Sequence, residues 1–192
     1  WKGGVICIFN MNPGKKHEGW DQIMTLPANQ EIVLENISGN VMGIVAEINP
    51  GSSQMFEINV LQSPDKQEFT RIAFFQNRGM NNGRSYKRPR PKRISNQIHS
   101  QLCIESSYFS ILPDARSRAP ETAPISLQKG ENLKLRIFID RSIVEVFANG
   151  KQCVAMRVYP GLEESTGVSL RSQGQSSELL SFNAYQMKSI YE

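Results

Sequence analysis

Apolar and polar residues alternate along most of the chain, so the dominant period of the sequence is two. In residues 133–139, leucine and isoleucine occupy the odd positions, and Lys134, Arg136 and Phe138 stand between them. Successive side chains of a β-strand point to opposite faces, so this alternation predicts a strand with one face in a core. Similar runs lie at 5–9, 31–34, 41–48, 55–61, 69–75, 102–105, 143–148, 154–159, 168–171 and 179–187. No stretch keeps the helical period of 3.6 for more than about two turns.

Turn-forming residues separate these runs and indicate the same fold class. Asn149-Gly150 stands between two strand runs, where it favours a type I′ hairpin turn with positive φ at both central residues. Asn-Pro-Gly at 49–51 and Pro-Gly at 160–161 mark further turns. About ten short strands with turns between them predict an all-β fold, an antiparallel β-sandwich of two sheets.

The net charge of +4 comes from one segment of the chain. The sequence has 22 Lys and Arg against 18 Asp and Glu, and six of the basic residues lie at positions 84, 87, 88, 90, 92 and 93. Without these six, 16 basic residues stand against 18 acidic ones, so the rest of the chain carries −2. The basic segment belongs to a polar stretch, 77–100, whose Gly, Asn and Pro content predicts a long loop.

Arg88, Arg90 and Arg93 in this basic segment allow three interpretations. They can belong to a solvated loop, they can contact another domain or subunit by pairing with carboxylates, or they can bind a polyanion. A nucleic-acid site would need aromatic side chains among the basic ones for stacking, and Tyr86 is the one aromatic residue among them. We therefore expect no nucleic-acid partner for this chain.

Several other classes of protein and site are disfavoured by residue counts and spacing. Cys7, Cys103 and Cys153 are widely spaced within apolar strand runs, a pattern typical of small buried hydrophobes and not of a disulfide framework or zinc site. The histidines at 17 and 99 are expected in polar loops, with no paired acid and nucleophile nearby. No apolar run approaches the ~20 residues that cross a bilayer. We expect no metal, no cofactor and no membrane contact.

Four segments of the chain resemble one enzyme family. Residues 133–150 read Leu-Lys-Leu-Arg-Ile-Phe-Ile-Asp-Arg-Ser-Ile-Val-Glu-Val-Phe-Ala-Asn-Gly. This segment closely resembles the C-terminal β-sandwich of glycoside hydrolase family 32, which includes invertases, inulinases, levanases and fructan exohydrolases. Arg-Val-Tyr-Pro at 157–160 and Asp-Ala-Arg-Ser-Arg at 114–118 are similar to two further motifs of the family. Gly-Trp-Asp-Gln-Ile-Met-Thr-Leu-Pro at 19–27 is similar to the segment that closes the family's catalytic propeller.

The resemblance implies two parts in this chain. Residues 1–27 are expected to be the last strands of a five-bladed β-propeller, and residues 28–192 the lectin-like β-sandwich that packs against it. Phe9 and Trp20, in the first part, are the residues expected to lie beside substrate. Such rings are more often core or domain-interface anchors than rings that stack on a sugar, and we favour the anchor for both. Family members are often secreted or periplasmic, so the resemblance points to such a compartment.

The catalytic motifs of the family are absent from the sequence. Family 32 chemistry resembles retaining glycoside hydrolysis, in which a nucleophile and an acid–base carboxyl lie roughly 5 Å apart. In the family these groups come from W-M-N-D-P-N and E-C motifs, and a third carboxylate comes from R-D-P. None of the four aspartates, at 21, 65, 114 and 140, precedes a proline, and no Glu-Cys pair occurs. The resemblance therefore implies a chain without catalytic residues, inactive alone, whose partner is an upstream propeller that binds a fructose-containing sugar.

Two hypotheses of function, from different classes, remain. In the first, the chain is the accessory sandwich of a sucrose- or fructan-cleaving hydrolase, where it stabilises the propeller and shapes access to its pocket. In the second, it is a free-standing carbohydrate-binding or protein-interaction module. The segment at 19–27 favours the first, because an independent module has no use for a strand that completes another domain. Exposed propeller-facing strands would also favour self-association into a homo-oligomer.

Overall fold

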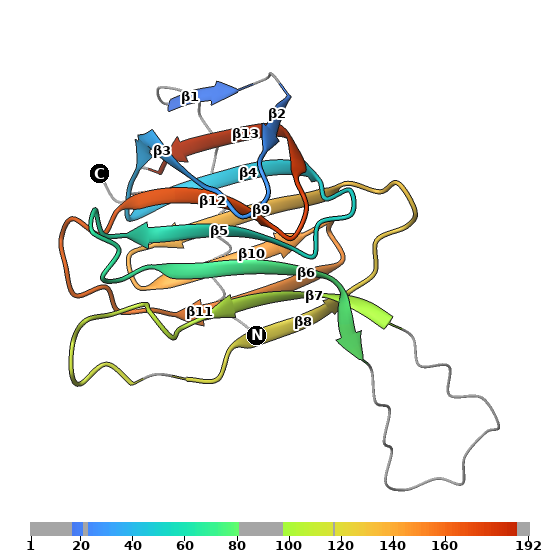
Figure 1. The fold of residues 1–192 in the computed structure, drawn as a ribbon. Helices are drawn as coiled ribbons and strands as arrows, with labels where there is room; N and C mark the ends of the chain where they lie inside the picture. Colours follow the sequence, from blue (N-terminus) through green and yellow to red (C-terminus); the bar gives the residue numbers. More distant parts are fainter. Residues whose placement is uncertain (1–16, 21–22, 81–97, 117, 188–192) are drawn as a thin grey trace, which may run out of the picture.

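The structure, a computed structural model, describes residues 17–20, 23–80, 98–116 and 118–187. Every regular element in these ranges is a β-strand, and the strands form two antiparallel sheets that pack face to face (Figure 1). The described part of the chain therefore has no helix long and apolar enough to cross a membrane. The predicted fold class, an all-β antiparallel sandwich of two sheets, is confirmed.

The first sheet, sheet A, has seven strands. Six of them lie in the order β1 (His17–Trp20), β13 (Ser177–Gln186), β4 (Val41–Asn49), β9 (Leu133–Asp140), β10 (Ile143–Ala148) and β11 (Gln152–Arg157). The seventh strand, β2 (Met24–Leu26), also pairs with β13. The N-terminal strands thus extend the edge of a sheet that the rest of the chain builds, and the domain boundary predicted at residue 27 stays a prediction.

The second sheet, sheet B, has six strands. Their order is β3 (Glu31–Ser38), β12 (Gly167–Gln173), β5 (Met55–Gln62), β6 (Thr70–Met80), β7 (Ile98–Glu105) and β8 (Glu121–Ile125). All of its strand pairings are antiparallel. Short turns such as the one between β3 and β4 carry the chain from one sheet to the other.

The alternation of the sequence places the core between the sheets. In β9, Leu133, Leu135, Ile137 and Ile139 are each at most 1% exposed, and Lys134 between them is exposed. These side chains join one buried cluster with residues of sheet B such as Phe56, Ile58 and Phe74. Burial of a large apolar side chain stabilises the fold by roughly 1.5–3 kcal/mol, so this cluster supplies most of the driving force.

The hairpin turn predicted from Asn149-Gly150 is confirmed. Asn149 has φ of 52° and Gly150 has φ of 63°, both in the left-handed region. The N–H of Lys151 donates to the carbonyl of Ala148 at 2.9 Å and closes the turn between β10 and β11. Asn tolerates this region better than most residues, and Gly adopts it without a steric penalty.

Two sequence expectations were wrong in detail. The strand β8 was not predicted, because Glu121 shares its inner face with only two apolar residues, Ala123 and Ile125. This strand lies at the edge of sheet B, where a proline removes no ladder hydrogen bond that the sheet needs. Cys153, expected to be buried, is exposed on β11, whereas Cys103 is buried as expected. The strand run predicted at 5–9, with Cys7, lies outside the described residues.

Candidate functional site

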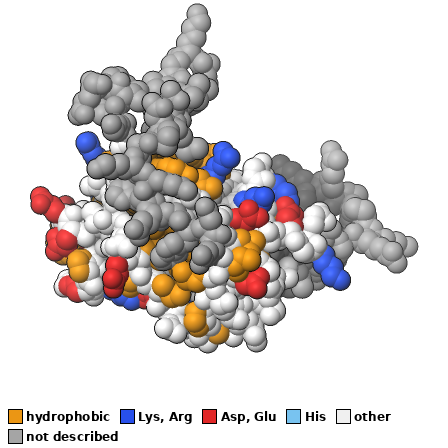
Figure 2. Space-filling model, turned by 90° about the horizontal axis from the view of Figure 1, so that it is seen from above, with side chains coloured by type: hydrophobic (Ala, Val, Ile, Leu, Met, Phe, Trp, Pro, Cys, Tyr) orange, Lys and Arg blue, Asp and Glu red, His pale blue; other side chains and the backbone are white. Residues whose placement is uncertain are grey.

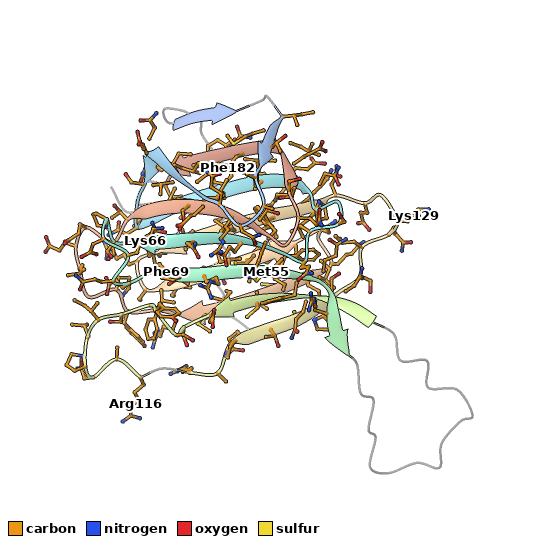
Figure 3. All side chains as sticks on the ribbon, viewed as in Figure 1. Met55, Lys66, Phe69, Arg116, Lys129 and Phe182 are labelled. Carbon is orange, nitrogen blue, oxygen red and sulfur yellow. The ribbon has the colours of Figure 1, made fainter. Side chains whose placement is uncertain are left out.

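Five connections gather at one end of the sandwich, which we call the loop end. They are the β3–β4 turn, the β5–β6 loop, the β7–β8 loop, the β9–β10 turn and the β11–β12 loop. The antiparallel pairings require this arrangement. β3, β5, β7, β9 and β11 all end at this end of the sandwich, and the strand that follows each of them begins there. Figure 3 places Lys66 and Arg116 at this end and Lys129 at the opposite end.

Three of the segments that carried the family resemblance meet at the loop end. Residues 114–116 and 118 lie in the β7–β8 loop, the segment 140–142 forms the β9–β10 turn, and 157–160 leads into the β11–β12 loop. The N–H of Val158 donates to the carbonyl of Ser142 at 2.8 Å and joins the last two segments. Each of these segments was identified from the sequence by its resemblance to a family motif. That the three segments share a surface was not predicted.

Glu68, at the end of the β5–β6 loop, holds the loop end together. Its carboxylate accepts the backbone N–H groups of Ile111, Gly161 and Leu162, each at 2.9 Å, and the hydroxyl of Ser165. The residue has no exposed surface. One carboxylate thus ties the β5–β6 loop to both the β7–β8 and the β11–β12 loop.

The hydrogen bonds to Glu68 decide its protonation. Burial raises the pKa of this carboxyl, but the hydrogen bonds from Ser165, Gly161, Leu162 and Ile111 outweigh burial, so its pKa lies below the ordinary value. A general acid in glycoside hydrolysis needs the opposite, a raised pKa and a free path to substrate. Glu68 is therefore a structural anion that organises loops, and it does not have the properties of a catalytic acid.

The surface above Glu68 is unusually apolar. Tyr108, Ile111, Leu112 and Tyr159 are 52%, 43%, 43% and 38% exposed. Leu112 and Tyr159 line two adjoining hollows of about 340 and 410 Å³. The view from the side of β1 and β2 shows that hydrophobic side chains are exposed among charged ones on that edge as well (Figure 2). An apolar surface of this kind is typical of a contact with another protein or of a ligand-binding groove.

Charged side chains border the two hollows. Asp114, Arg116 and Arg118 line the smaller hollow, and Arg141 and Glu163 line the larger one. All five side chains are exposed. Within the described ranges the three arginines form no salt bridge, so their charge is available to a partner.

Tyr108 is held in place by a stack next to the loop end. Its ring lies parallel to that of Phe69, with centroids 5.2 Å apart, and the Arg71 guanidinium lies 5.4 Å from the Phe69 centroid. Arg71 in turn pairs with Glu57 at 3.1 Å and Glu105 at 2.8 Å on the outer face of sheet B. Burial raises the pKa of Glu57, although Arg71 opposes the shift. This carboxyl is therefore committed to an ion-pair network across the sheet.

The candidate site residues named from the sequence stay predictions, because their side chains are not among those that the structure describes. Phe9, Arg88, Arg90 and Arg93 lie outside the described residues. Trp20 lies in β1, where its backbone is in register with Phe182 of β13, and its side chain is outside the description. Within the described ranges, no group of three or more His, Cys, Asp or Glu side chains is arranged to hold a metal ion.

Comparisons with known proteins agree on one family. The sequence model described as "Glycosyl hydrolases family 32 C terminal" matches residues 14–186. The levanase of Bacillus subtilis (strain 168) is 29% identical over 175 residues, which are 90% of this chain and 22% of the levanase. An acid beta-fructofuranosidase of Vicia faba is 30% identical over 111 residues, 57% of this chain and 15% of that protein.

Solved structures show the same fold. Fructan 1-exohydrolase IIa from Cichorium intybus superposes with a TM-score of 0.71 at 17% identity, covering 89% of this chain and 35% of that one. Exo-inulinase from Aspergillus awamori superposes with a TM-score of 0.66 at 16% identity, covering 94% of this chain and 30% of that one. The chain thus spans about a third or less of the length of these relatives. The chain belongs to glycoside hydrolase family 32, and it corresponds to the C-terminal β-sandwich of that family.

Proposed function

We propose that this chain is the accessory sandwich of a β-fructosidase, which stabilises a catalytic propeller and shapes access to its pocket. The observation that carries the proposal is the match to the C-terminal part of the family, over residues 14–186, in a chain that covers 22% of a levanase. In this proposal residues 1–27 belong to the end of the propeller, while β1 and β2 within them also pair with β13 at the edge of sheet A. A sucrose or fructan substrate binds to the propeller.

The chemistry of the loop end supports a role in contact and not in catalysis. Its central carboxylate, Glu68, is buried and held ionised by four hydrogen bonds. The surface around it offers exposed apolar side chains and arginines, which are groups that bind a protein surface. The nucleophile and acid–base carboxyls of the reaction would then belong to the propeller.

A carbohydrate-binding module is the second candidate. Tyr159 lines a hollow together with Asp114 and Arg116, and a ring beside polar side chains is a combination that suits a sugar. The two candidates differ in a simple respect. The accessory sandwich acts only with a propeller, and a binding module holds sugar by itself.

The gene and an activity assay test the proposed function together. We expect the sequence upstream of the Trp1 codon to encode a propeller with W-M-N-D-P, R-D-P and E-C motifs. The complete polypeptide should release fructose from sucrose, inulin or levan, and the 192-residue chain should release none. A gene that encodes no such propeller, or fructose release by the chain alone, would overturn the proposal.

A further inference from the structure

We propose that the outer face of sheet B, which points away from the core, binds a neutral oligosaccharide. Arg71 and Arg171 donate hydrogen bonds to its hydroxyl groups, and the ring of Tyr108 packs against a sugar ring. The inference goes beyond the proposed function, because it concerns a site on this chain and holds whether or not the chain is joined to a propeller. Neither arginine lines the hollows beside Tyr159.

The register of sheet B brings the residues of this site together. Glu57 of β5 is directly opposite Arg171 of β12, and Asn59 of β5 is directly opposite Arg71 of β6. Arg71 is also opposite Glu105 of β7. The apolar residues that alternate with these five along the strands are buried in the core. Since successive side chains point to opposite faces, the five side chains share the outer face.

Glu57 holds the two arginines in place from below. Its side chain is 3% exposed, and its carboxylate lies 3.1 Å from Arg71 Nε and 3.9 Å from Arg171 Nη1. The two arginine side chains are themselves 26% and 36% exposed. A buried carboxylate beneath two partly exposed cations fixes one side of each guanidinium and leaves the other side facing solvent.

Both arginines keep donors that the described part of the chain does not use. Arg171 Nε has no hydrogen-bond partner there, and a separation of 3.9 Å from Glu57 is too long for a hydrogen bond. Arg71 donates from Nη1 to Glu105 at 2.8 Å, and its Nε faces Glu57. Because a guanidinium has five N–H donors, each arginine can still bind a ligand.

A buried amide on the same face also has an unused hydrogen-bonding group. Asn59 is 5% exposed, and its Nδ2 donates to Ser169 Oγ at 3.1 Å. Its Oδ1 accepts no hydrogen bond within the described ranges. Buried polar atoms of native proteins are nearly always paired, so each exception needs an explanation. An unpaired acceptor beside Arg71 fits a face that a bound ligand completes.

The charges of the face specify a neutral ligand. Its ion pairs join three carboxylates to three basic side chains, so the face has no net charge. The six residues are Glu31, Glu57, Glu105, Lys66, Arg71 and Arg171. An anion or a cation finds no excess of opposite charge here. A hydroxyl group both donates and accepts, so it can bind a guanidinium and a carboxylate that lie side by side.

Tyr108 supplies the apolar part of the site. Its ring is 52% exposed and lies parallel to that of Phe69, with centroids 5.2 Å apart. Phe69 lies at the loop-end side of sheet B (Figure 3). The Arg71 guanidinium lies 5.9 Å from the Tyr108 centroid, so the ring and the donors are neighbours. An aromatic ring with a polar edge suits the mixed C–H and hydroxyl surface of a sugar.

A titration of the 192-residue chain tests the inference. The probes are neutral oligosaccharides prepared from levan, inulin and cellulose, and the signals are backbone amide and arginine Nε–H resonances. We expect at least one probe to give saturable shifts at Glu57, Asn59, Arg71, Tyr108 and Arg171. Resonances of residues around Glu131, at the opposite end, should not move.

Three variants show which residues make the contact. Arg171→Gln and Tyr108→Ala should each weaken binding by about tenfold, the effect of one lost hydrogen bond to a charged group or of one lost ring contact. Arg136→Gln is the matched control, because this exposed arginine lies on the outer face of sheet A, and it should bind as the wild type does. Circular dichroism establishes that all three variants are folded.

Several results would overturn the inference. Without a saturable shift from any probe, the face is an ion-pair network that only stabilises the sheet. Shifts confined to residues around Tyr159 would place the sugar in the hollows of the loop end. Equal affinities of Arg171→Gln, Tyr108→Ala and Arg136→Gln would exclude the named residues. The proposed function fails separately, through the absence of a propeller or of fructosidase activity in the complete polypeptide, and this titration measures neither.

Discussion

The two ends of the sandwich are each organised by one carboxylate, but the two carboxylates lie in different surroundings. At the loop end, Glu68 is fully buried and binds three backbone N–H groups and a hydroxyl. At the opposite end, the partly exposed Glu131 accepts Lys151 Nζ at 2.6 and 2.8 Å and the N–H of Gln128 at 2.7 Å. Both pKa values are lowered, and that of Glu131 falls to about 2 through the Gln128 N–H, Lys151 and Asn149.

The surfaces above these carboxylates differ more than the carboxylates do. Glu131 borders two hollows. One, of about 480 Å³, is lined mainly by polar residues and turn backbone, with Leu127 as its large apolar member. The other, of about 770 Å³, extends onto sheet A and is lined by Phe138 and Phe147 among charged side chains. Above Glu68, four large apolar side chains are exposed. The same arrangement, a carboxylate that accepts several hydrogen bonds, therefore serves two purposes. It closes a solvated turn at one end, and at the other it supports a surface suited to a partner.

Removal of Glu68 should have the largest effect of any single substitution at either end. Glu68→Ala leaves three part-buried backbone N–H groups and the buried Ser165 hydroxyl without their acceptor. We expect the free energy of unfolding to fall by about 3 kcal/mol or more, because each buried unsatisfied donor costs about 1–3 kcal/mol. Urea unfolding followed by circular dichroism measures the loss.

Glu131→Ala is the matched control for this substitution. Its carboxylate is partly exposed, so water can replace the lost partners and the loss of stability should be clearly smaller. Equal losses for the two variants would show that burial does not distinguish the two ends.

Acid should weaken the loop end through Glu68. Because the folded-state pKa of Glu68 lies below its ordinary value of 4.5, its carboxylate stabilises the fold above the unfolded pKa. That contribution is lost as the pH falls through the folded pKa. The difference in unfolding free energy between wild type and Glu68→Gln should therefore shrink below about pH 4.5. Parallel curves between pH 7 and pH 3 would contradict this role.

A side chain at Gly161 should disturb the loop end to a lesser degree. Gly161→Ala places a Cβ 2.9 Å from Leu112 Cγ and 3.1 Å from Ile111 Cγ1, so both side chains must shift. We expect a loss of about 1 kcal/mol, as is typical of overpacking next to adjustable side chains. Gly43→Ala is the control, because its Cβ would meet its nearest atom at 3.9 Å, an ordinary contact. Thermal unfolding of the two variants should differ, and a neutral Gly161→Ala would contradict the close approach.

An effect of similar size is expected at the Asn149 turn of the opposite end. Asn149 has φ of 52°, and its side chain accepts the N–H of Lys134 at 2.9 Å. Asn149→Ala should cost about 1 kcal/mol, since Ala disfavours positive φ and lacks the side-chain oxygen. Asn149→Gly keeps the backbone conformation and should cost less. If both variants unfold at the same denaturant concentration, the backbone conformation contributes nothing measurable.

The alternation of apolar and polar residues was sufficient to predict the sandwich. It was insufficient to predict the hydrogen bonds that organise the loop end. The strands β9 and β10 follow directly from residues 133–148, because their side chains alternate between core and solvent. β8 was missed because an edge strand tolerates Pro124 and needs few apolar residues. The hydrogen bonds of Glu68 join residues that are 43 and 93 positions apart. In the sequence this glutamate follows Asp65, Lys66 and Gln67 and is typical of a solvated loop.

The most direct test of the central claim is the calorimetric unfolding of the complete polypeptide with one charge reversed at each end. If the sandwich stabilises the propeller through a contact at the loop end, as the proposed function implies, the wild-type polypeptide should unfold in one cooperative transition. Arg116→Glu should separate the transition into two, or lower its midpoint, and Lys129→Glu at the opposite end should leave it unchanged. Both side chains are exposed, so neither reversal should unfold the sandwich itself. A wild-type polypeptide that unfolds in two independent transitions, with Arg116→Glu indistinguishable from Lys129→Glu, would contradict the account.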